Sequence, residues 1–443
     1  MDNSGSVMVI GGGLAGCEAA WMLARNGIRV DLFEMRPGVR TPAHETSLLA
    51  ELVCSNSLRS SNPANAVGLL KQEMRALGSL TMDAASRHAV AAGDALAVDR
   101  TGFSSEITRL VGGHPLIRLE RSEVTGLPGT AEAIVASGPL TSPALSEAVA
   151  SATGMEYLYF YDAIAPIVDV QSLDRSMVFA QSRYGKGGGE DYLNCPMYGD
   201  EYFMFVKELL LAEAVQTRDF EKQIHFQGCM PIEAMAATGP LALAHGPLKP
   251  VGLTDPRTGR RPFAVVQLRR ENEAGTAWNL VGCQTRLTYP EQKRVFRMIP
   301  GMEKAEFLRL GSMHRNTFIN GPALLDSALR MNGRESLVFA GQIAGVEGYV
   351  ESAACGILAG LFGAARHRGL EPPVPPSETA LGSLLRHVTS SRWKHYQPSN
   401  INYGLFPPLA HRLPPKERNA AYSERARAAL EPWIREVACL LEA

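Results

Sequence analysis

The strongest constraint on the fold is a glycine-rich turn near the amino terminus. A strand-like apolar run, residues 7–10, leads into Gly11-Gly12-Gly13-Leu14-Ala15-Gly16, and a helix-compatible stretch, residues 17–26, follows. A second strand-like run, residues 29–33, comes directly after the helix. A G-x-G-x-x-G turn between a strand and a helix is the fingerprint of a dinucleotide-binding βαβ unit. We therefore expect the chain to begin with a Rossmann-like parallel sheet.

Each glycine of this turn has its own expected role. Gly11 permits the tight turn, Gly13 lets a pyrophosphate approach the backbone, and Gly16 lets the helix pack closely on the strand. The backbone N–H groups of the first helical turn are expected to face the phosphates. The cofactor-binding residues predicted in this turn are Gly11, Gly12, Gly13, Leu14, Ala15 and Gly16.

Glu34 ends the second strand, where a carboxylate of this fingerprint accepts hydrogen bonds from the adenosine ribose. We include Arg36, two residues further on, among the expected cofactor-binding residues. The run 134–139, with Ser137 and Gly138, is similar to the strand and turn that lie under the adenosine half of such a cofactor.

A segment near the other end of the chain favours FAD over NAD. Residues 336–340 form a buried strand that delivers Gly341, Gln342 and Gly345 to the start of a small-residue helix carrying Tyr349. Flavoproteins often end with such a strand and turn, whose helix points its positive end at the flavin. Gln342 stands where an acid is usual. Because we find no second fingerprint in the sequence, NADH or NADPH is expected to bind only transiently.

Nearly two hundred residues separate the two halves of this expected FAD site, too many for a connection. We predict a glutathione-reductase-type FAD-binding domain, α/β and Rossmann-like, interrupted by a smaller α+β insertion domain. The FAD-binding domain takes residues 1–170 and 311–370, and the insertion takes 171–310. The Pro-rich stretch 371–376 and a helical tail to residue 443 complete the chain.

Charge and composition exclude several classes of protein. With 44 basic and 45 acidic side chains the chain is no polycation, but residues 257–297 hold nine basic and three acidic side chains. This sector is either a polyanion-binding surface or a solvated face. The longest apolar stretch, 353–365, is too short to cross a bilayer. No metal site is expected, because Cys-x-x-Cys and His-Glu-x-x-His are absent from the sequence.

Two of the seven cysteines stand out. Cys54 lies where an apolar run breaks into polar residues, and Cys229 lies in a Gly-Cys-x-Pro turn before a possible helix start. Backbone N–H groups at a helix start lower the pKa of a thiol, so Cys229 is a candidate for a reactive thiolate. Cys54 is a second candidate because polar residues directly follow it. A buried inert thiol is the alternative for each. Cys195, before Pro196, is expected in a turn.

The sequence resembles the bacterial folate- and FAD-dependent tRNA (uracil-5-)-methyltransferases almost from end to end. The segments that carry the resemblance are the glycine fingerprint and residues 41–44, 53–58, 137–142, 161–168, 192–197, 229–233, 262–269, 313–317, 345–354 and 397–400. The resemblance implies a cytoplasmic enzyme that makes ribothymidine in the T-loop of tRNA. It also implies 5,10-methylenetetrahydrofolate as the carbon donor, with FAD reduced by NADH or NADPH.

The family's thiols fall on Cys229 as the candidate nucleophile and Cys54 as the candidate acid/base. Thiolate addition at uracil C6 turns the ring into an enolate whose C5 can attack a methylene carbon, and a second group must then remove the C5 proton. His314 is expected to stack on the pterin or the base. The RNA-binding residues predicted from the basic sector are Arg286, Lys293, Arg294 and Arg297.

Four rival functions stay open at this point. One is a flavoprotein that binds and reshapes RNA without modifying it, for which replacement of both thiols should matter little. A related family modifies wobble uridines, but it has a long carboxyl-terminal helical extension. The same methyl transfer could act on a ribosomal RNA uridine, because the sequence does not show the RNA. A simple NAD(P)H-flavin oxidoreductase would use neither RNA nor folate and would need no nucleophilic cysteine. No obligate protein partner and no membrane association are expected.

Overall fold

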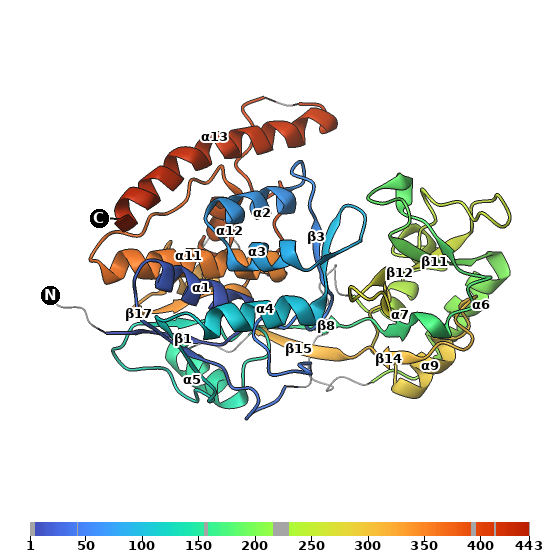
Figure 1. Cartoon of the computed structure of the whole chain (residues 1–443), viewed down its shortest axis with the longest axis horizontal. Coiled ribbons are helices and arrows are strands. Elements are labelled where there is room, and N and C mark those ends of the chain that lie inside the picture. The colour runs from blue at the N-terminus through green and yellow to red at the C-terminus, as the bar shows by residue number, and fades with distance from the viewer. Residues whose placement is uncertain are drawn as a thin grey trace.

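The computed structural model describes residues 5–41, 43–154, 158–215, 230–390, 396–411 and 413–442. Figure 1 shows two bodies, one built on a sheet crossed by long helices and the other on a second sheet. Each body has its own cluster of buried apolar side chains. The described residues therefore form two separately packed cores.

The first sheet has six strands in the order β16-β17-β7-β1-β2-β6. All neighbours are parallel except β16 and β17. The strands are β1 (Val7–Ile10), β2 (Val30–Phe33), β6 (Ile117–Glu120), β7 (Ala133–Val135), β16 (Arg330–Met331) and β17 (Arg334–Phe339). Because β1, β7 and β17 are parallel neighbours, the turns that follow them meet at one edge of the sheet. The expected Rossmann-like sheet is confirmed.

Two helices cross this sheet in close contact. They are α1 (Leu14–Arg25) and α11 (Tyr349–His367). A Cβ added at Gly356 would lie 2.2 Å from the Ala15 carbonyl oxygen, and one at Gly360 would lie 2.6 Å from the Met22 Cβ. Small residues on α11 therefore let the two helices approach closely.

Further helices and a small sheet β3-β5-β4 complete the first body. Their bounds are β3 (Ser57–Ser60), α2 (Ala66–Ala76), α3 (Leu80–Arg87), β4 (Ala89–Val90), β5 (Ala95–Val98), α4 (Arg100–Gly112), α5 (Pro143–Thr153), α10 (Gly321–Leu324), α12 (Ala380–Thr389) and α13 (Pro415–Glu442). Residues 371–376 form neither helix nor strand, as the prolines predict.

In the sequence, the second body is inserted between β8 (Leu158–Ala163) and β15 (Met313–Phe318). These two strands pair with each other in antiparallel fashion. We call residues 164–311 the insertion domain. Its sheet has the order β10-β11-β12-β13-β9-β14. The elements are β9 (Ile167–Asp169), β10 (Phe179–Ala180), β11 (Tyr192–Met197), α6 (Gly199–Leu211), α7 (Ile232–Ala236), α8 (Ala242–His245), β12 (Ala264–Arg270), β13 (Ala277–Leu280), α9 (Tyr289–Phe296) and β14 (Phe307–Arg309).

Two details differ from the sequence expectations. β9 precedes residue 171 and already pairs with β13 and β14, so we propose that the insertion domain begins before residue 167. Cys195 lies in β11 and not in a turn. Both differences arise because strand pairing depends on residues far away in the chain, which the local pattern does not contain.

Candidate active site

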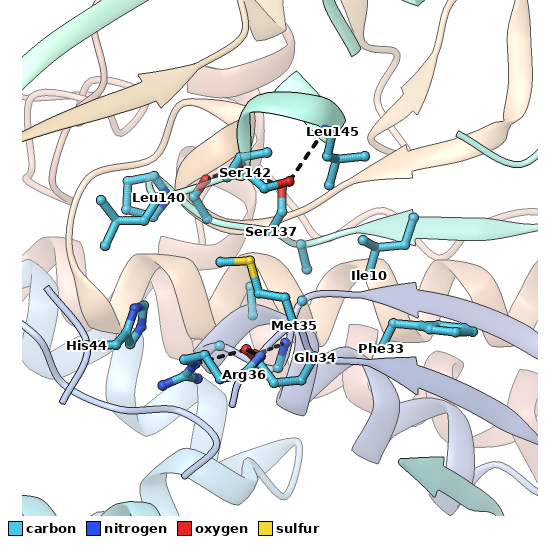
Figure 2. A pocket seen from close by; sticks show the side chains of 18 of the residues that line it. Ile10, Phe33, Glu34, Met35, Arg36, His44, Ser137, Leu140, Ser142 and Leu145 are labelled. Carbon is cyan, nitrogen blue, oxygen red and sulfur yellow. Dashed lines mark hydrogen bonds and ion pairs between the residues drawn. The ribbon is translucent and has the colours of Figure 1, made fainter. Parts of the chain in front are cut away.

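A pocket lies at the edge of the first sheet where the three glycine-containing turns meet. The space between its walls is about 990 Å³, with open solvent at its mouth included. Figure 2 shows Glu34, Met35 and Arg36 on one side and Ser137, Leu140 and Ser142 on the other. The predicted residues that line it are Gly11, Gly12, Gly13, Leu14, Ala15, Glu34, Arg36, Ser137, Gly138, Gln342 and Tyr349.

The glycine turn has the shape that a pyrophosphate requires. Gly11 has a φ of +106°, and a Cβ there would lie 2.5 Å from the Ala136 carbonyl oxygen. A Cβ on Gly13 would meet no atom within 4 Å, so the backbone is open on the pocket side. Gly13 also caps α1 without a side-chain hydrogen bond, which leaves the helix N–H groups for a ligand. These observations fit a bound dinucleotide.

Three glycines predicted as cofactor-binding are not among the residues that line the pocket. A Cβ on Gly16 would lie 1.8 Å from the Gly11 carbonyl oxygen, and one on Gly341 would lie 2.6 Å from the Ala15 Cβ. At Gly345 the added atom would lie 2.1 Å from the Tyr396 hydroxyl. Glycine at these positions permits close packing behind the pocket wall. We propose that they shape the cofactor site indirectly.

Glu34 is buried and lies at the point expected for the ribose contact. Its carboxylate accepts hydrogen bonds from the Gly12 N–H at 3.0 Å and from the Arg36 Nε at 2.8 Å. Burial raises the pKa of Glu34, but the hydrogen bonds and charge of Arg36 lower it further, so the net pKa is below its ordinary value. Glu34 is therefore an ionised acceptor, which suits ribose hydroxyls.

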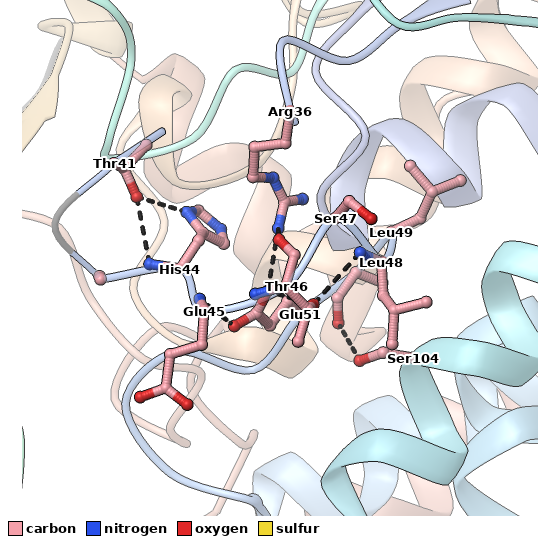
Figure 3. Close-up of polar contacts among 12 residues, drawn as sticks. Arg36, Thr41, His44, Glu45, Thr46, Ser47, Leu48, Leu49, Glu51 and Ser104 are labelled. Carbon is pink, nitrogen blue, oxygen red and sulfur yellow. Dashed lines mark hydrogen bonds and ion pairs between the residues drawn. The ribbon is translucent and has the colours of Figure 1, made fainter. Parts of the chain in front are cut away.

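Glu51, which the sequence did not single out, holds the neighbouring loop in place (Figure 3). Its carboxylate accepts from the Arg36 Nη1 at 3.0 Å, the Glu45 N–H at 2.8 Å and the Thr46 hydroxyl at 2.6 Å. His44 of the same loop lines the pocket, and its Nδ1 lies 2.6 Å from the Thr41 hydroxyl. The contact between Arg36 and Glu51 joins this loop to the end of β2.

The turn after β17 contains an acid, Glu347, that was not predicted as a site residue. The Gln342 amide donates a hydrogen bond to the Glu347 carboxylate at 3.0 Å, and Glu347 is buried. A carboxylate therefore lies beside the position where Gln342 replaces the usual acid. The signal was in the sequence, five residues after Gln342.

Cys54 adjoins the pocket and is held from its inner side by Tyr349. The Tyr349 hydroxyl accepts hydrogen bonds from the Cys54 N–H at 2.7 Å and the Ser55 N–H at 3.2 Å. Tyr349 and Val53 both line the pocket. Burial, and then the charge of Cys54, raises the pKa of Tyr349, so its phenol stays protonated. The Cys54 thiol is half-buried and lies 3.8 Å from the Ala163 carbonyl oxygen.

A cation links the segment before this thiol to the insertion domain. Arg100 donates to the Leu52 carbonyl oxygen and pairs with Glu271 of the insertion domain at 2.8 Å. Burial lowers the pKa of Arg100, but Glu271, Tyr349 and Cys54 raise it, so its net pKa lies above the ordinary value. Arg100 therefore stays protonated in this ion pair.

Two other predicted site residues lie wholly or partly outside the described residues. Cys229 lies outside the described residues. The segment directly after it is fixed, because the Ile232 N–H donates to the Gln284 carbonyl oxygen at 2.7 Å and Glu233 accepts from the Thr285 hydroxyl at 3.0 Å. His314 lies on β15 opposite Asp162 of β8, and its side chain is outside the described part.

The predicted RNA-binding residues lie on or near α9, and the three arginines among them have partners within the protein. Arg294 pairs with Glu291 at 2.7 Å and with Glu208 of α6. The Arg297 Nη2 donates to the Ala305 carbonyl oxygen at 2.9 Å, and Lys293 is exposed. Arg286 lies 3.6 Å from the Glu233 carboxylate. Figure 1 shows α9 beside β14, on the insertion domain.

Several pocket residues were missed because their role depends on neighbouring strands. Thr141 bridges the Ser137 hydroxyl at 2.7 Å and the Gly138 carbonyl oxygen at 2.8 Å. Ser142 caps α5, and its hydroxyl accepts from the Leu145 N–H at 3.4 Å. The Ser-Pro start of α5 was a visible signal for a second helix end at this pocket.

None of the helices in the described ranges combines the length and apolar character required to span a bilayer. Within the same ranges, His, Cys, Asp and Glu form no group of three or more that could hold a metal ion.

Comparison with known proteins gave concordant matches. The model of the family "Glucose inhibited division protein A" matches residues 6–371. A methylenetetrahydrofolate–tRNA-(uracil-5-)-methyltransferase TrmFO from Geobacter sulfurreducens is 60% identical over 98% of this chain and 100% of its own. One of the same name from Heliobacterium modesticaldum is 58% identical over 97% and 98%. Among solved structures, Aquifex aeolicus GidA in its form I crystal covers 99% of this chain and 78% of its own, with TM-score 0.71 and 17% identity. The last match shows the fold alone.

Proposed function

The chain belongs to the family of methylenetetrahydrofolate–tRNA-(uracil-5-)-methyltransferases, and we propose that it makes ribothymidine in the T-loop of tRNA. It takes the carbon from 5,10-methylenetetrahydrofolate and the electrons from NADH or NADPH. The enzyme works in the cytoplasm, where its tRNA substrate is found.

The observation that carries this proposal is the hydrogen bond between a pocket residue and the loop of a thiol. Tyr349 lines the dinucleotide pocket, and its hydroxyl lies 2.7 Å from the Cys54 backbone nitrogen. A simple flavin oxidoreductase needs no thiol beside its cofactor. A thiol beside the cofactor suits an enzyme that activates a uracil ring by nucleophilic addition.

The pocket would hold FAD by its glycine turn, with Glu34 at the ribose and Tyr349 towards the flavin end. When bound, FAD supplies the hydride that converts an exocyclic methylene group to a methyl group. The residues of the chain do the rest. The Cys229 thiolate forms a bond with C6 of the uracil, so that C5 can attack the donated carbon. Cys54 then takes the proton from C5, and the electron pair of that C–H bond expels the tetrahydrofolate nitrogen, which leaves an exocyclic methylene group at C5. The bond between sulfur and C6 breaks when this methylene becomes a methyl group, and the Cys229 thiolate is released.

The RNA has to present an unstacked base to these thiols, which costs a few kcal/mol. Four basic residues on or near α9 would contact its phosphates, namely Arg286, Lys293, Arg294 and Arg297. His314 of β15 would stack on the pterin or the base. The pairing of Arg294 with Glu291 and Glu208 limits its share of phosphate binding.

Transfer of label from carbon-14 methylenetetrahydrofolate tests the proposal. The full chain with FAD and NADPH is given an unmodified tRNA transcript, a transcript with the T-loop uridine replaced by cytidine, and a ribosomal RNA transcript. We expect label only in the first. Label in the ribosomal transcript would make it the substrate, whereas NADPH oxidation without label in any RNA would favour an RNA-independent oxidoreductase.

A further inference from the structure

The loop that carries Cys54 is held from outside by an arginine of the insertion domain. Arg269 lies on β12 and is buried, with 8% of its surface exposed. Its Nη2 donates to the Ser55 hydroxyl at 2.7 Å and its Nε donates to the Asn56 side-chain oxygen at 3.0 Å. One planar guanidinium therefore holds the two residues that directly follow Cys54.

Asn56 completes the connection between the two bodies. It is fully buried, and its amide nitrogen donates to the Arg270 carbonyl oxygen of β12 at 2.9 Å and to the Val98 carbonyl oxygen of β5 at 2.8 Å. The loop thus has contacts on both sides. Tyr349 holds its backbone nitrogens from the pocket side, and Arg269 holds its side chains from the insertion domain.

The surroundings of this contact are polar. The apolar cores of the two bodies are separate clusters, and further ion pairs cross between them, from Arg100 to Glu271 at 2.8 Å and from Arg309 to Glu45 at 3.0 Å. Polar interfaces between domains permit relative motion more readily than large apolar ones. The placement of the Cys54 loop therefore depends on where the insertion domain sits.

We infer that Arg269 is a positioning residue, which couples docking of the insertion domain to the placement of the Cys54 thiol beside the cofactor pocket. It acts through Ser55 and Asn56 and does not touch the reacting atoms. This inference deepens the proposed function and rests on it for the role of Cys54. The coupling itself can be measured without methyl transfer.

The test measures alkylation of Cys54 by iodoacetamide, followed by peptide mass spectrometry, in the FAD-bound full chain. Four variants are compared with the wild type: Arg269→Gln, Arg269→Lys, Ser55→Ala and the double variant Arg269→Gln/Ser55→Ala. Arg118→Gln is the matched control, because it removes an arginine from an exposed ion pair with Asp31 on the first sheet. FAD content and thermal unfolding report whether each variant is folded.

We expect Arg269→Gln to raise the limiting alkylation rate at high pH by at least about fivefold, because the freed loop exposes the half-buried thiol. Arg269→Lys should give a smaller rise, since an ammonium group reaches only one of the two acceptors well. Adding Ser55→Ala to Arg269→Gln should raise the alkylation rate by a smaller factor than Ser55→Ala raises it in the wild type. The reason is that both changes remove the same hydrogen bond between Arg269 and Ser55. The control should match the wild type.

In methyl transfer, Arg269→Gln should lower kcat about tenfold and change the KM for tRNA less than about twofold, since a misplaced group slows the chemical step. A rise in the alkylation rate of less than about twofold in Arg269→Gln would overturn the inference. So would an alkylation rate in the double variant that equals the product of the two single effects, because the two changes would then act independently. If the wild type transfers no label while alkylation responds as expected, the proposed function fails and the coupling stands.

Discussion

The Tyr349 hydroxyl accepts a hydrogen bond from the Cys54 backbone N–H at 2.7 Å, although the two residues are 295 positions apart. Tyr349 opens α11 and lines the dinucleotide pocket, whereas Cys54 lies on the loop before β3. The bond therefore joins the backbone of the half-buried Cys54 to a residue of the pocket wall.

Replacement of Tyr349 by phenylalanine removes only this acceptor. Two backbone N–H groups lose their partner, a change worth roughly 1–3 kcal/mol. We expect kcat for methyl transfer to fall about tenfold with FAD content unchanged. Steady-state kinetics and the flavin absorbance measure the two quantities. An unchanged kcat would show that the position of Cys54 does not depend on the phenol.

Gly13 and Gly16 should respond differently to a side chain. Valine at Gly13 meets no protein atom within 4 Å of its Cβ, so Gly13→Val should leave the apoprotein stable and weaken FAD binding by at least about tenfold. Alanine at Gly16 would place a Cβ 1.8 Å from the Gly11 carbonyl oxygen. Overpacking of this kind costs roughly 1–3 kcal/mol.

Flavin titration and thermal unfolding of the apoprotein separate the two effects. The distinction between cradle and packing glycine would be wrong if Gly13→Val destabilised the apoprotein as much as Gly16→Ala did.

Glu73 makes stability depend on pH. It is buried on α2 and accepts from the Ala380 and Leu381 N–H groups at the start of α12, both at 2.8 Å. Burial raises its pKa from 4.5 to about 8, against the lowering effect of these hydrogen bonds. Because the pKa of Glu73 is higher in the folded than in the unfolded protein, the protonated side chain stabilises the folded state at pH values below the pKa of the unfolded state. This contribution to stability is lost as the pH rises towards about 8.

The Glu73→Gln variant lacks this titration. Its Tm relative to the wild type should therefore increase from about pH 5 to about pH 8.5. Exposed Glu147 on α5 supplies the control Glu147→Gln, whose Tm difference should stay flat. A flat difference for Glu73→Gln as well would contradict the burial argument.

Charge reversal tests the RNA-binding residues near α9. Because Arg294 already pairs with Glu291 and Glu208, reversal at exposed Lys293 and at Arg297 should weaken tRNA binding more than loss of Arg294 alone. Each lost phosphate contact should reduce the salt slope of binding by about 1. The control is Arg29→Glu, which changes the residue directly before β2 of the first sheet. Unaltered affinity at low salt would remove these residues from the RNA surface.

The sequence predicted the parts of the site that are local in the chain. The turn from Gly11 to Gly16 and the end of β2 at Glu34 are specified by backbone geometry within one βαβ unit. The contacts of Cys54 were out of reach, because Tyr349 and Arg269 come from elements that only the tertiary fold brings to it. The supporting acid Glu347 was missed because its link to Gln342 depends on the conformation of the turn.

In the proposed mechanism, Cys54 removes the C5 proton of a tRNA uridine beside bound FAD. Release of tritium from a transcript labelled at C5 of the T-loop uridine measures this step directly. With folate and NADPH present, the wild type should release tritium in step with ribothymidine formation. Cys54→Ala should keep its full FAD content and release none. Release at the wild-type rate by Cys54→Ala would contradict the account and assign the proton to another group.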